Sequence, residues 1–270
     1  MSPSQGAQDF TTLLYERQDH VTTITLNRPE RRNALNRTLY RELERAFLAA
    51  SADPETRCVI VTGADPTFCA GEDVKELMAE QAEATAAMGP VVRYPPTPAG
   101  QAIALCEKPV IAAVNGAAVG WGMEIALLAD LRIASERASF AELFIKRGLI
   151  SDLGGLWRLP AIVGPEKAAE LLFTGDPIDA AEAERIRLVG RVTAHAELMP
   201  QARALAQRIA ANPPLALRYM KEGLRRGAFG DPAAIGSWAI EVIRRLFLTE
   251  DHREGVAAYF EKRPPVFTGR

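Results

Sequence analysis

The first stretch with a regular apolar pattern predicts a β-hairpin and then an amphipathic helix. Leu13–Arg17 and Val21–Leu26 are short β-prone runs, and a polar segment, 18–20, separates them. After a polar loop, Asn36 can cap a helix that we expect to run to about Ala50. Its apolar residues recur at helical spacing and should face the core: Leu39, Leu43, Ala46 and Phe47.

Strands and helices alternate in the middle of the chain. Cys58–Thr62 and Val110–Val114 are mostly apolar runs, and each leads through a glycine-containing loop into a helix. Leu131–Ala134 is a third such strand, and it follows a predicted helix at Met123–Ala129. This alternation predicts an α/β fold. Residues 79–100 are rich first in Ala and then in Pro, which is typical of a flap over a site.

The chain beyond Gly154 has an almost wholly helical pattern. We expect helices at 167–174, 180–187, 198–211, 215–227, 232–248 and 253–262. The last of these carry more large apolar residues than a small lobe would bury: Leu217, Met220, Leu224, Trp238, Ile240, Ile243 and Phe247. We therefore predict a core domain, 1–197, and a helical C-terminal region, 198–270, that packs against other copies of the chain.

Composition narrows the class of protein. A chain of 270 residues, 48% hydrophobic, can build one large core, and a net charge of −2 without a basic block gives no nucleic-acid footprint. Three well-separated cysteines, Cys58, Cys69 and Cys106, suggest neither disulfides nor a metal site. The first ten residues have no targeting pattern, and no apolar run approaches the roughly 20 residues that cross a bilayer. We expect a soluble, cytoplasmic protein with no membrane partner.

Two loops carry the candidate chemistry. Phe68–Asp73 and Asn115–Glu124 each combine small residues with the start of a predicted helix, where the first backbone N–H groups lack intrahelical partners. Two such N–H groups that converge on one oxygen form an oxyanion hole. A glycine-rich turn before a helix is also a common tight connection, so the pattern alone leaves both interpretations open.

These loops belong to a set of short motifs that are spread over nearly the whole chain. The other motifs are Ile24-Thr25-Leu26-Asn27-Arg28-Pro29, Asn33-Ala34-Leu35, Leu172-Phe173-Thr174-Gly175-Asp176, Leu188-Val189-Gly190 and Phe260-Glu261-Lys262-Arg263. Together they resemble the enoyl-CoA hydratase/isomerase (crotonase) family. The resemblance implies a crotonase-like spiral of ββα units with a helical C-terminal trimerisation region. It also implies a homotrimer or a dimer of trimers, and an acyl-CoA thioester as substrate. No separate cofactor is implied, because coenzyme A is part of the substrate.

The resemblance also assigns roles to residues. The oxyanion donors are the backbone N–H groups of Glu72 and Trp121, and Glu124 is one of the family's two catalytic glutamates. For Glu124 the alternative is an ordinary exposed residue in a helix start. Contacts to the substrate or to its coenzyme A are implied for Arg28, Ala34, Cys69, Ala70, Gly71, Asp73, Gly120 and Lys262. Arg28 and Lys262 are equally consistent with solvated surface.

The second catalytic glutamate is where this sequence departs from the family, because Phe144 occupies the matching position. Glu142, two residues earlier, is a weak substitute, since it faces the same way only in an extended segment. Asp152 stands where some family isomerases and dehalogenase-like members carry an acidic group. The alternative for Asp152 is an N-cap for a helix at Leu153–Ala161.

These alternatives imply different functions. Two carboxylates that flank the double bond favour hydration of a 2-enoyl-CoA, our first expectation, whereas one carboxylate favours isomerisation, our second. The loss of the second glutamate also leaves open a catalytically silent acyl-CoA-binding protein. A basic run, Arg218, Lys221, Arg225 and Arg226, is the only feature that suggests RNA, and the slightly acidic total charge argues against a nucleic-acid partner.

Overall fold

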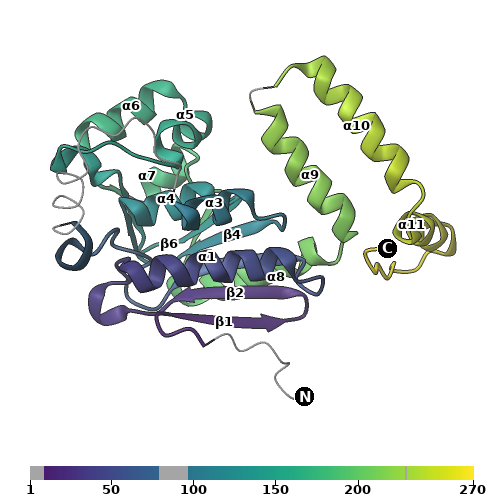
Figure 1. The fold of residues 1–270 in the computed structure, drawn as a ribbon, viewed down its shortest axis with the longest axis horizontal. Helices are drawn as coiled ribbons and strands as arrows, with labels where there is room; N and C mark the ends of the chain where they lie inside the picture. The colour runs from purple at the N-terminus through teal and green to yellow at the C-terminus, as the bar shows by residue number, and fades with distance from the viewer. Residues whose placement is uncertain (1–8, 79–96, 229) are drawn as a thin grey trace.

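A computed structural model describes residues 9–78, 97–228 and 230–270 of the chain. Six strands form its main sheet in the order β1-β2-β3-β4-β6-β9 (Figure 1). Only β1 and β2 pair antiparallel, as the predicted hairpin, and each later neighbour in the sheet is parallel. The strands are β1 (Leu13–Gln18), β2 (Val21–Leu26), β3 (Cys58–Gly63), β4 (Val110–Val114), β6 (Leu131–Ser135) and β9 (Arg191–Thr193).

Helices cover both faces of this sheet, which confirms the predicted α/β fold. On one face lie α1 (Arg37–Ala52), α3 (Pro98–Leu105) and α4 (Trp121–Leu128), and on the other lies α8 (Leu198–Ala210). Residues of β4 alternate between the two sides: Ala112 packs with the first group, and Ile111 packs with α8. A strand buried on both faces needs apolar residues at every position, which explains the uninterrupted runs of β3 and β4.

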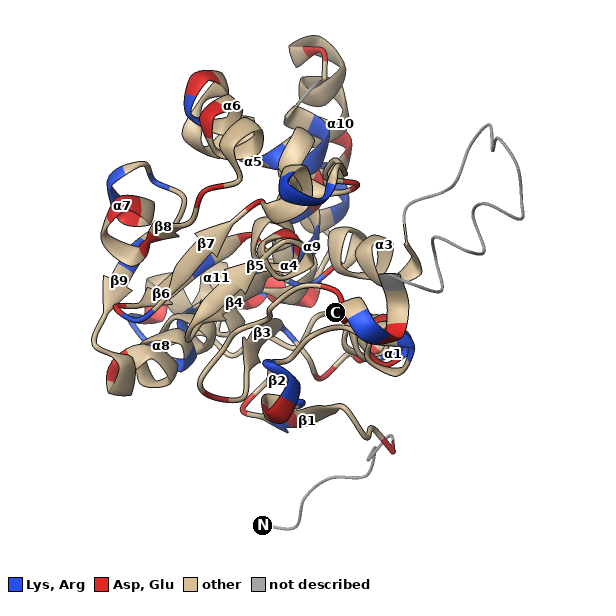
Figure 2. Ribbon diagram, turned by 90° about the vertical axis from the view of Figure 1, so that its left-hand side faces the viewer, with Lys and Arg blue, Asp and Glu red and all other residues tan. Residues whose placement is uncertain are grey.

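A second, three-stranded sheet lies beside α4. It consists of β5 (Ala117–Val119), β7 (Ser139–Ala141) and β8 (Ile178–Asp179), with β5 and β7 parallel and β7 and β8 antiparallel. Figure 2 shows β5 next to α4 in the middle of the body. These strands are not among the elements predicted from the sequence, because runs of two or three residues carry too little periodicity to be recognised.

Shorter elements complete the body: η1 (Pro29–Arg31), η2 (Val74–Met78), η3 (Leu143–Arg147), η4 (Gly154–Leu156), α5 (Arg158–Val163), α6 (Pro165–Thr174), α7 (Ala180–Arg185) and η5 (His195–Glu197). Asn36 caps α1 by accepting a hydrogen bond from the Leu39 N–H, and Gly175 ends α6 in a left-handed conformation. The single helix expected at Leu153–Ala161 is wrong: η4 and α5 divide it. Most of the predicted flap, residues 79–96, lies outside the described part of the chain.

Three helices extend away from the body as an arm (Figure 1). They are α9 (Pro214–Gly227), α10 (Pro232–Leu246) and α11 (Glu250–Glu261). The predicted division at 197/198 falls at the start of α8, a helix that packs on the main sheet, and the chain leaves the body only with α9. Within the described residues, no helix has both the length and the apolar character to cross a membrane.

Basic residues of α9 tie the arm to the body. The Lys221 ammonium lies 2.7 Å from an Asp130 carboxylate oxygen and donates to the Lys108 carbonyl oxygen. Arg225 donates to the Ala104 carbonyl oxygen, and Arg218 lies 2.6 Å from Glu107. The basic run that suggested RNA is therefore engaged within the chain. Acidic and basic residues are scattered over all the layers of the molecule (Figure 2).

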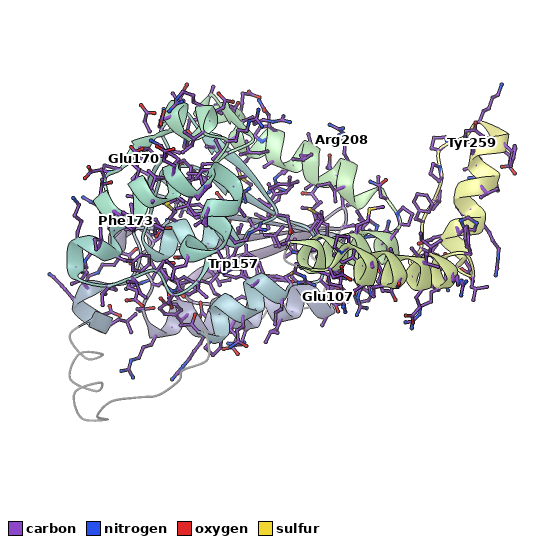
Figure 3. The ribbon with its side chains drawn as sticks, turned by 90° about the horizontal axis from the view of Figure 1, so that it is seen from above. Glu107, Trp157, Glu170, Phe173, Arg208 and Tyr259 are labelled. Atoms are coloured by element: carbon purple, nitrogen blue, oxygen red, sulfur yellow. The ribbon has the colours of Figure 1, made fainter. Side chains whose placement is uncertain are left out.

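Lys221→Met should lower the free energy of unfolding by about 2 kcal/mol, because it leaves Asp130 without its partner in a partly buried pair. Urea titration measures this change. Arg208 projects into solvent (Figure 3), so Arg208→Met is a matched control and should change the free energy by no more than about 0.5 kcal/mol. Equal losses in the two variants would show that the ion pair does not secure the arm.

Candidate active site

Two glycine turns form the centre of the site. Gly71 and Gly120 have φ values of 89° and 53°, a left-handed backbone that residues with a side chain rarely adopt. A Cβ atom on Gly71 would also lie only 2.8 Å from the Val119 carbonyl oxygen. The close approach of the two loops therefore requires glycine at Gly71, and the turn into α4 requires it at Gly120.

A backbone bridge holds the two loops together. The Cys69 N–H donates to the Ala117 carbonyl oxygen and the Val119 N–H donates to the Cys69 carbonyl oxygen, both at 2.9 Å. As a result, the Cβ position of Gly71 lies 3.6 Å from the Trp121 nitrogen. Residues about 50 positions apart in the chain thus present their backbone to the same point.

The predicted oxyanion donors belong to these adjacent turns. Trp121 is the first residue of α4, where a backbone N–H has no intrahelical acceptor. Leu35 pairs with the Glu72 segment as a parallel bridge, donating to the Gly71 carbonyl oxygen and accepting from the Asp73 N–H. In such a bridge the Glu72 N–H points to the other edge. The two predicted donors thus lie on adjacent turns, as an oxyanion hole built from main-chain groups requires.

The loop predicted to contact coenzyme A is fastened to the first turn by a buried ion pair. An Arg28 nitrogen lies 3.3 Å from Asp73 and donates to the Ala34 carbonyl oxygen at 2.5 Å, and another lies 3.1 Å from Glu76. The Ala70 N–H donates to the Arg32 carbonyl oxygen. The Arg28 guanidinium is buried between carboxylates, so it stabilises this loop instead of standing open to a phosphate.

The structure brings together every predicted site residue except Lys262. This lysine directly follows α11, and Tyr259, near the end of that helix, lies at the far end of the arm in Figure 3. Cys69 is fully buried, and burial raises the pKa of its thiol to about 12. Its contribution to the site is therefore the backbone bridge, and its sulfur is a packed side chain.

Glu124 is completely buried on α4, so the alternative of an ordinary exposed helix residue is wrong. Its carboxylate accepts hydrogen bonds from the Ser151 hydroxyl and from the Gly154 and Gly155 N–H groups. Burial nevertheless raises its pKa to about 7, against the lowering effect of these donors. Glu124 therefore stays partly protonated near neutral pH, which suits a group that both gives and takes a proton.

Asp152 is exposed beside this turn and does not act as a helix cap. The N-cap residues of η4 and α5 are Leu153 and Trp157, and neither makes a side-chain cap hydrogen bond. The carboxylate of Glu124 instead accepts from the N–H groups of Gly154 and Gly155. The Asp152 carboxylate instead accepts a hydrogen bond from the Trp121 side chain. Desolvation raises the Asp152 pKa, and this hydrogen bond lowers it. The N-cap alternative is wrong, and Asp152 stands next to one oxyanion turn.

Glu142 has turned inward directly after β7, close to Glu124. It is 1% exposed, and neither of its carboxyl oxygens has a hydrogen-bond partner in the described part of the chain. Phe144 points toward the turn that leads into α4: its ring tip lies 4.0 Å from the Cβ position of Gly120. The expectation of a weak substitute therefore missed a buried acid, because the turn from β7 into η3 cannot be read from spacing.

Two residues that contact the site, Tyr40 and Ser151, were not predicted from the sequence. The Tyr40 hydroxyl donates to the Glu72 carboxylate at 2.9 Å, and the Tyr40 ring packs edge-on against Trp121 with centroids 4.8 Å apart. Ser151 was read only as a neighbour of Asp152. The adjacent glycines Gly154-Gly155 were the available signal, because two glycines in a row permit a buried carboxylate to approach the backbone.

No three His, Cys, Asp or Glu side chains among the described residues are grouped so as to hold a metal ion. The groups described at the site are main-chain donors and carboxyl groups. Main-chain donors on adjacent turns, with carboxyl groups nearby, are the arrangement expected of an enzyme that stabilises an oxyanion while protons move on neighbouring carbon atoms.

Comparison with known proteins gives the family. Residues 16–270 match the family model described as enoyl-CoA hydratase/isomerase. The chain is 36% identical over 265 residues to a crotonyl-CoA hydratase from Syntrophomonas wolfei, covering 97% of this chain and 99% of that protein. It is 36% identical over 256 residues to a short-chain-enoyl-CoA hydratase from Clostridium acetobutylicum, covering 94% and 97%.

A solved structure of an enoyl-CoA hydratase from Bacillus anthracis superposes with a TM-score of 0.88 at 34% identity, covering 96% of this chain and all of that one (100%). The chain belongs to the enoyl-CoA hydratase/isomerase family, and its fold is the crotonase fold. The resemblance found in the sequence is thereby confirmed. Members of this family act on acyl-CoA thioesters.

The two turns predict different outcomes for two neighbouring substitutions. Gly120→Val should lower kcat for an acyl-CoA thioester at least about a hundredfold, because a β-branched residue at this left-handed position displaces the Trp121 N–H. Trp121→Phe keeps the backbone donor and the ring packing and should retain most of the turnover.

Trp121→Phe also removes the indole hydrogen bond that lowers the Asp152 pKa, so that pKa rises and less of the carboxylate is ionised at a given pH. The acidic limb of its pH–rate profile should therefore move to higher pH. Equal loss of kcat in both variants at their optimal pH would show that the indole, and not the amide, stabilises the oxyanion.

Proposed function

We propose that the protein is an enoyl-CoA hydratase that adds water across the double bond of a 2-enoyl-CoA. The observation that carries this proposal is the pair of turns that place the backbone of Glu72 and Trp121 at one point. The hydratases of Syntrophomonas and Clostridium, similar to this chain over nearly its full length, support the same reaction. Coenzyme A enters as part of the substrate, so no separate cofactor is needed.

The chemistry requires such turns. When the oxygen of water attacks the β-carbon, the electrons of the double bond move toward the thioester and its carbonyl oxygen becomes negative. Backbone N–H groups already aimed at that oxygen stabilise the charge without reorganising, and the loss of one donor costs about 3 kcal/mol in barrier height. Their rigidity comes from the Cys69 bridge and from the glycines at the two turns.

Two carboxyl groups can move the protons. Asp152, exposed at the edge of the site, takes a proton from the attacking water as the new C–O bond forms. Glu124, whose pKa is raised to about 7, gives its proton to the α-carbon of the enolate. The sum is one water added, and the proton held by Asp152 returns to Glu124 through solvent. Asp152 thus replaces the glutamate whose position Phe144 occupies.

Isomerisation is the second candidate, and Phe144 is the observation that favours it. With no carboxyl group at that position, Glu124 acting alone can carry a proton from one carbon of the acyl chain to another. Mass spectrometry separates the reactions, because hydration adds the mass of one water and isomerisation leaves the mass unchanged. Binding of the thioester without either change would identify a silent member of the family.

Substitution of the two carboxylates tests the assignment with a panel of 2-enoyl-CoA thioesters. Glu124→Gln and Asp152→Asn should each lower kcat at least about a hundredfold, the low end for a general acid–base group. The absorbance of the conjugated thioester measures turnover. Asp19→Asn, at an exposed position in the β1–β2 turn, is a matched control and should leave kcat unchanged. Full activity of Asp152→Asn would leave Glu124 as the sole base and favour the isomerase.

We also propose that the chain assembles as a homotrimer or a dimer of trimers. Among their described residues, α9 and α10 each bury one side chain, Lys221 and Val242 respectively. The arm leaves large apolar residues exposed: Met220, Leu224, Ile240, Ile243, Phe247, Val256, Tyr259 and Phe260. Exposed apolar surface of this extent is typical of a subunit interface.

A separate apolar surface on the body complements the arm. It includes Trp157 and Phe173, which lie on the body in Figure 3, whereas Tyr259 lies at the far end of the arm. Two different surfaces that meet across an interface are expected to close a ring rather than an isologous dimer. Within one chain Lys262 lies too far out to reach the site, so its predicted contact with coenzyme A requires a neighbouring subunit.

Light scattering at micromolar concentration should give a mass of three chains or a multiple of three. Phe260→Glu together with Leu224→Glu places charges on the exposed face of the arm and should dissociate the assembly. Arg208→Glu, a charge reversal at an exposed position of α8, is the control and should leave the mass unchanged. A stable wild-type monomer would contradict the proposal.

A further inference from the structure

Glu142 is a buried acid for which the proposed reaction has no use. It follows β7 directly, is 1% exposed, and neither carboxyl oxygen has a hydrogen-bond partner within the described residues. Buried carboxylates normally pair with a cation or with several N–H donors, because an unpaired buried charge is costly. The surroundings of Glu142 therefore favour the neutral, protonated form of its carboxyl group.

Glu142 and Glu124 lie against the same pair of glycines. A Cβ atom on Gly155 would stand 3.0 Å from a Glu142 carboxyl oxygen, and one on Gly154 would stand 3.0 Å from a Glu124 oxygen. Ser151 lies on the same turn, since its hydroxyl oxygen would be 2.6 Å from the Gly155 Cβ position. The turn at 151–155 therefore packs against Glu142 and binds Glu124.

The two glutamates differ in the donors that they receive. Glu124 accepts hydrogen bonds from Ser151, Gly154 and Gly155, whereas Glu142 accepts none from the residues that the structure describes. A pocket that offers donors to one of two neighbouring carboxyl groups stabilises the charge on that group and leaves the proton on the other.

Among the described residues, the charged groups that act on Glu142 are acidic. They are Glu124 on α4 and Asp152 in the segment before η4. Lys146, on η3 itself, is turned outward to Asp176 at 3.1 Å. Burial raises the pKa of Glu142 to about 9, and the charges of Glu124 and Asp152 add to the effect.

We propose that Glu142 is a positioning residue that acts as a neutral carboxylic acid: packed against Gly155, it keeps the 151–155 turn closed around the Glu124 carboxylate. Ionisation of Glu142 places a second negative charge beside Glu124 in a buried space and pushes the turn outward. The same turn carries Asp152 to Trp121, so its displacement disturbs both carboxyl groups of the proposed reaction.

Glu142→Gln tests this role, because the amide keeps the size of the side chain and cannot ionise. At neutral pH its kcat should fall less than about tenfold, well below the loss expected for a general acid or base. The wild-type kcat/KM profile should show an alkaline limb near pH 9, and this limb should be absent from Glu142→Gln. Glu166→Gln, at an exposed glutamate of α6, should keep the wild-type profile.

Three outcomes would overturn the proposal. An alkaline limb near pH 9 that persists in Glu142→Gln belongs to another group, whereas the limb near pH 7 that Glu124 imposes as proton donor is expected in both proteins. A wild-type kcat/KM profile without a limb near pH 9 shows that ionisation of Glu142 does not lower the activity. A fall in kcat of about a hundredfold or more at every pH shows that Glu142 exchanges a proton during turnover instead of positioning the turn.

Stability gives a readout that does not depend on the proposed hydratase reaction. A carboxyl group whose pKa is raised on folding, here from 4.5 to about 9, stabilises the fold below its ordinary pKa and loses that contribution as pH rises toward the folded pKa. Glu142→Gln lacks this loss, so its Tm relative to wild type should be higher at pH 8.5 than at pH 5. A Tm difference that is independent of pH would contradict a neutral Glu142.

Infrared spectroscopy of the wild-type protein covers the case in which Glu142→Gln does not fold. The carbonyl band of a protonated, buried carboxyl group should be present at pH 8 and should persist in Glu124→Gln, whose own carboxyl group is removed. Absence of that band in both proteins would overturn the proposal. If the chain turns over no enoyl thioester, the hydratase proposal fails while the infrared and Tm measurements still decide the state of Glu142.

Discussion

The site depends on one short piece of backbone pairing between Cys69 and the strand β5. Two hydrogen bonds of 2.9 Å fix the loop after β3 against the segment that leads into α4. Without them, the positive-φ turns at Gly71 and Gly120 would be two unrelated connections. With them, the start of α4 and the turn at Glu72 face one point, and the small sheet of β5, β7 and β8 extends from the same pairing. Preorganised donors of this kind are effective because they do not move when charge develops.

Burial of acidic groups is the second constraint, and it divides their roles. Glu124 is buried among donors, and Glu142 is buried with no donor among the described residues. Asp152 is exposed and accepts hydrogen bonds from its own backbone N–H and from the Trp121 side chain. The free-energy cost of carrying a negative charge therefore differs among the three carboxyl groups, and so do their pKa values. The turn at 151–155 joins all three, since Glu124 supplies the cap that its N–H groups would otherwise lack. A substitution in this turn is expected to affect all three groups together.

The arm differs from the body in that one ion pair holds it in place while most of its large apolar residues stay exposed. Lys221 fastens α9 to the body through a mostly buried ion pair, while the large apolar residues of α9, α10 and α11 remain exposed in the single chain. The fastening fixes the direction in which the arm leaves the body, and the exposed residues supply the surface that an assembly needs. Lys262 lies at the end of this arm, so the proposed assembly and the proposed contact with coenzyme A are linked.

The sequence by itself determined the hairpin, the long helices, the doubly covered strands β3 and β4, and the family. These features follow from local periodicity or from motifs of consecutive residues, such as the Asn36 cap and the loops around Gly71 and Gly120. Only the tertiary structure decided that Arg28 is buried against Asp73, that Glu124 caps η4 in place of Asp152, and that Glu142 lies unpartnered beside Glu124. The physical reason is that burial and hydrogen-bond partners are set by segments distant in the chain, and no spacing between neighbouring residues records which of those segments will meet.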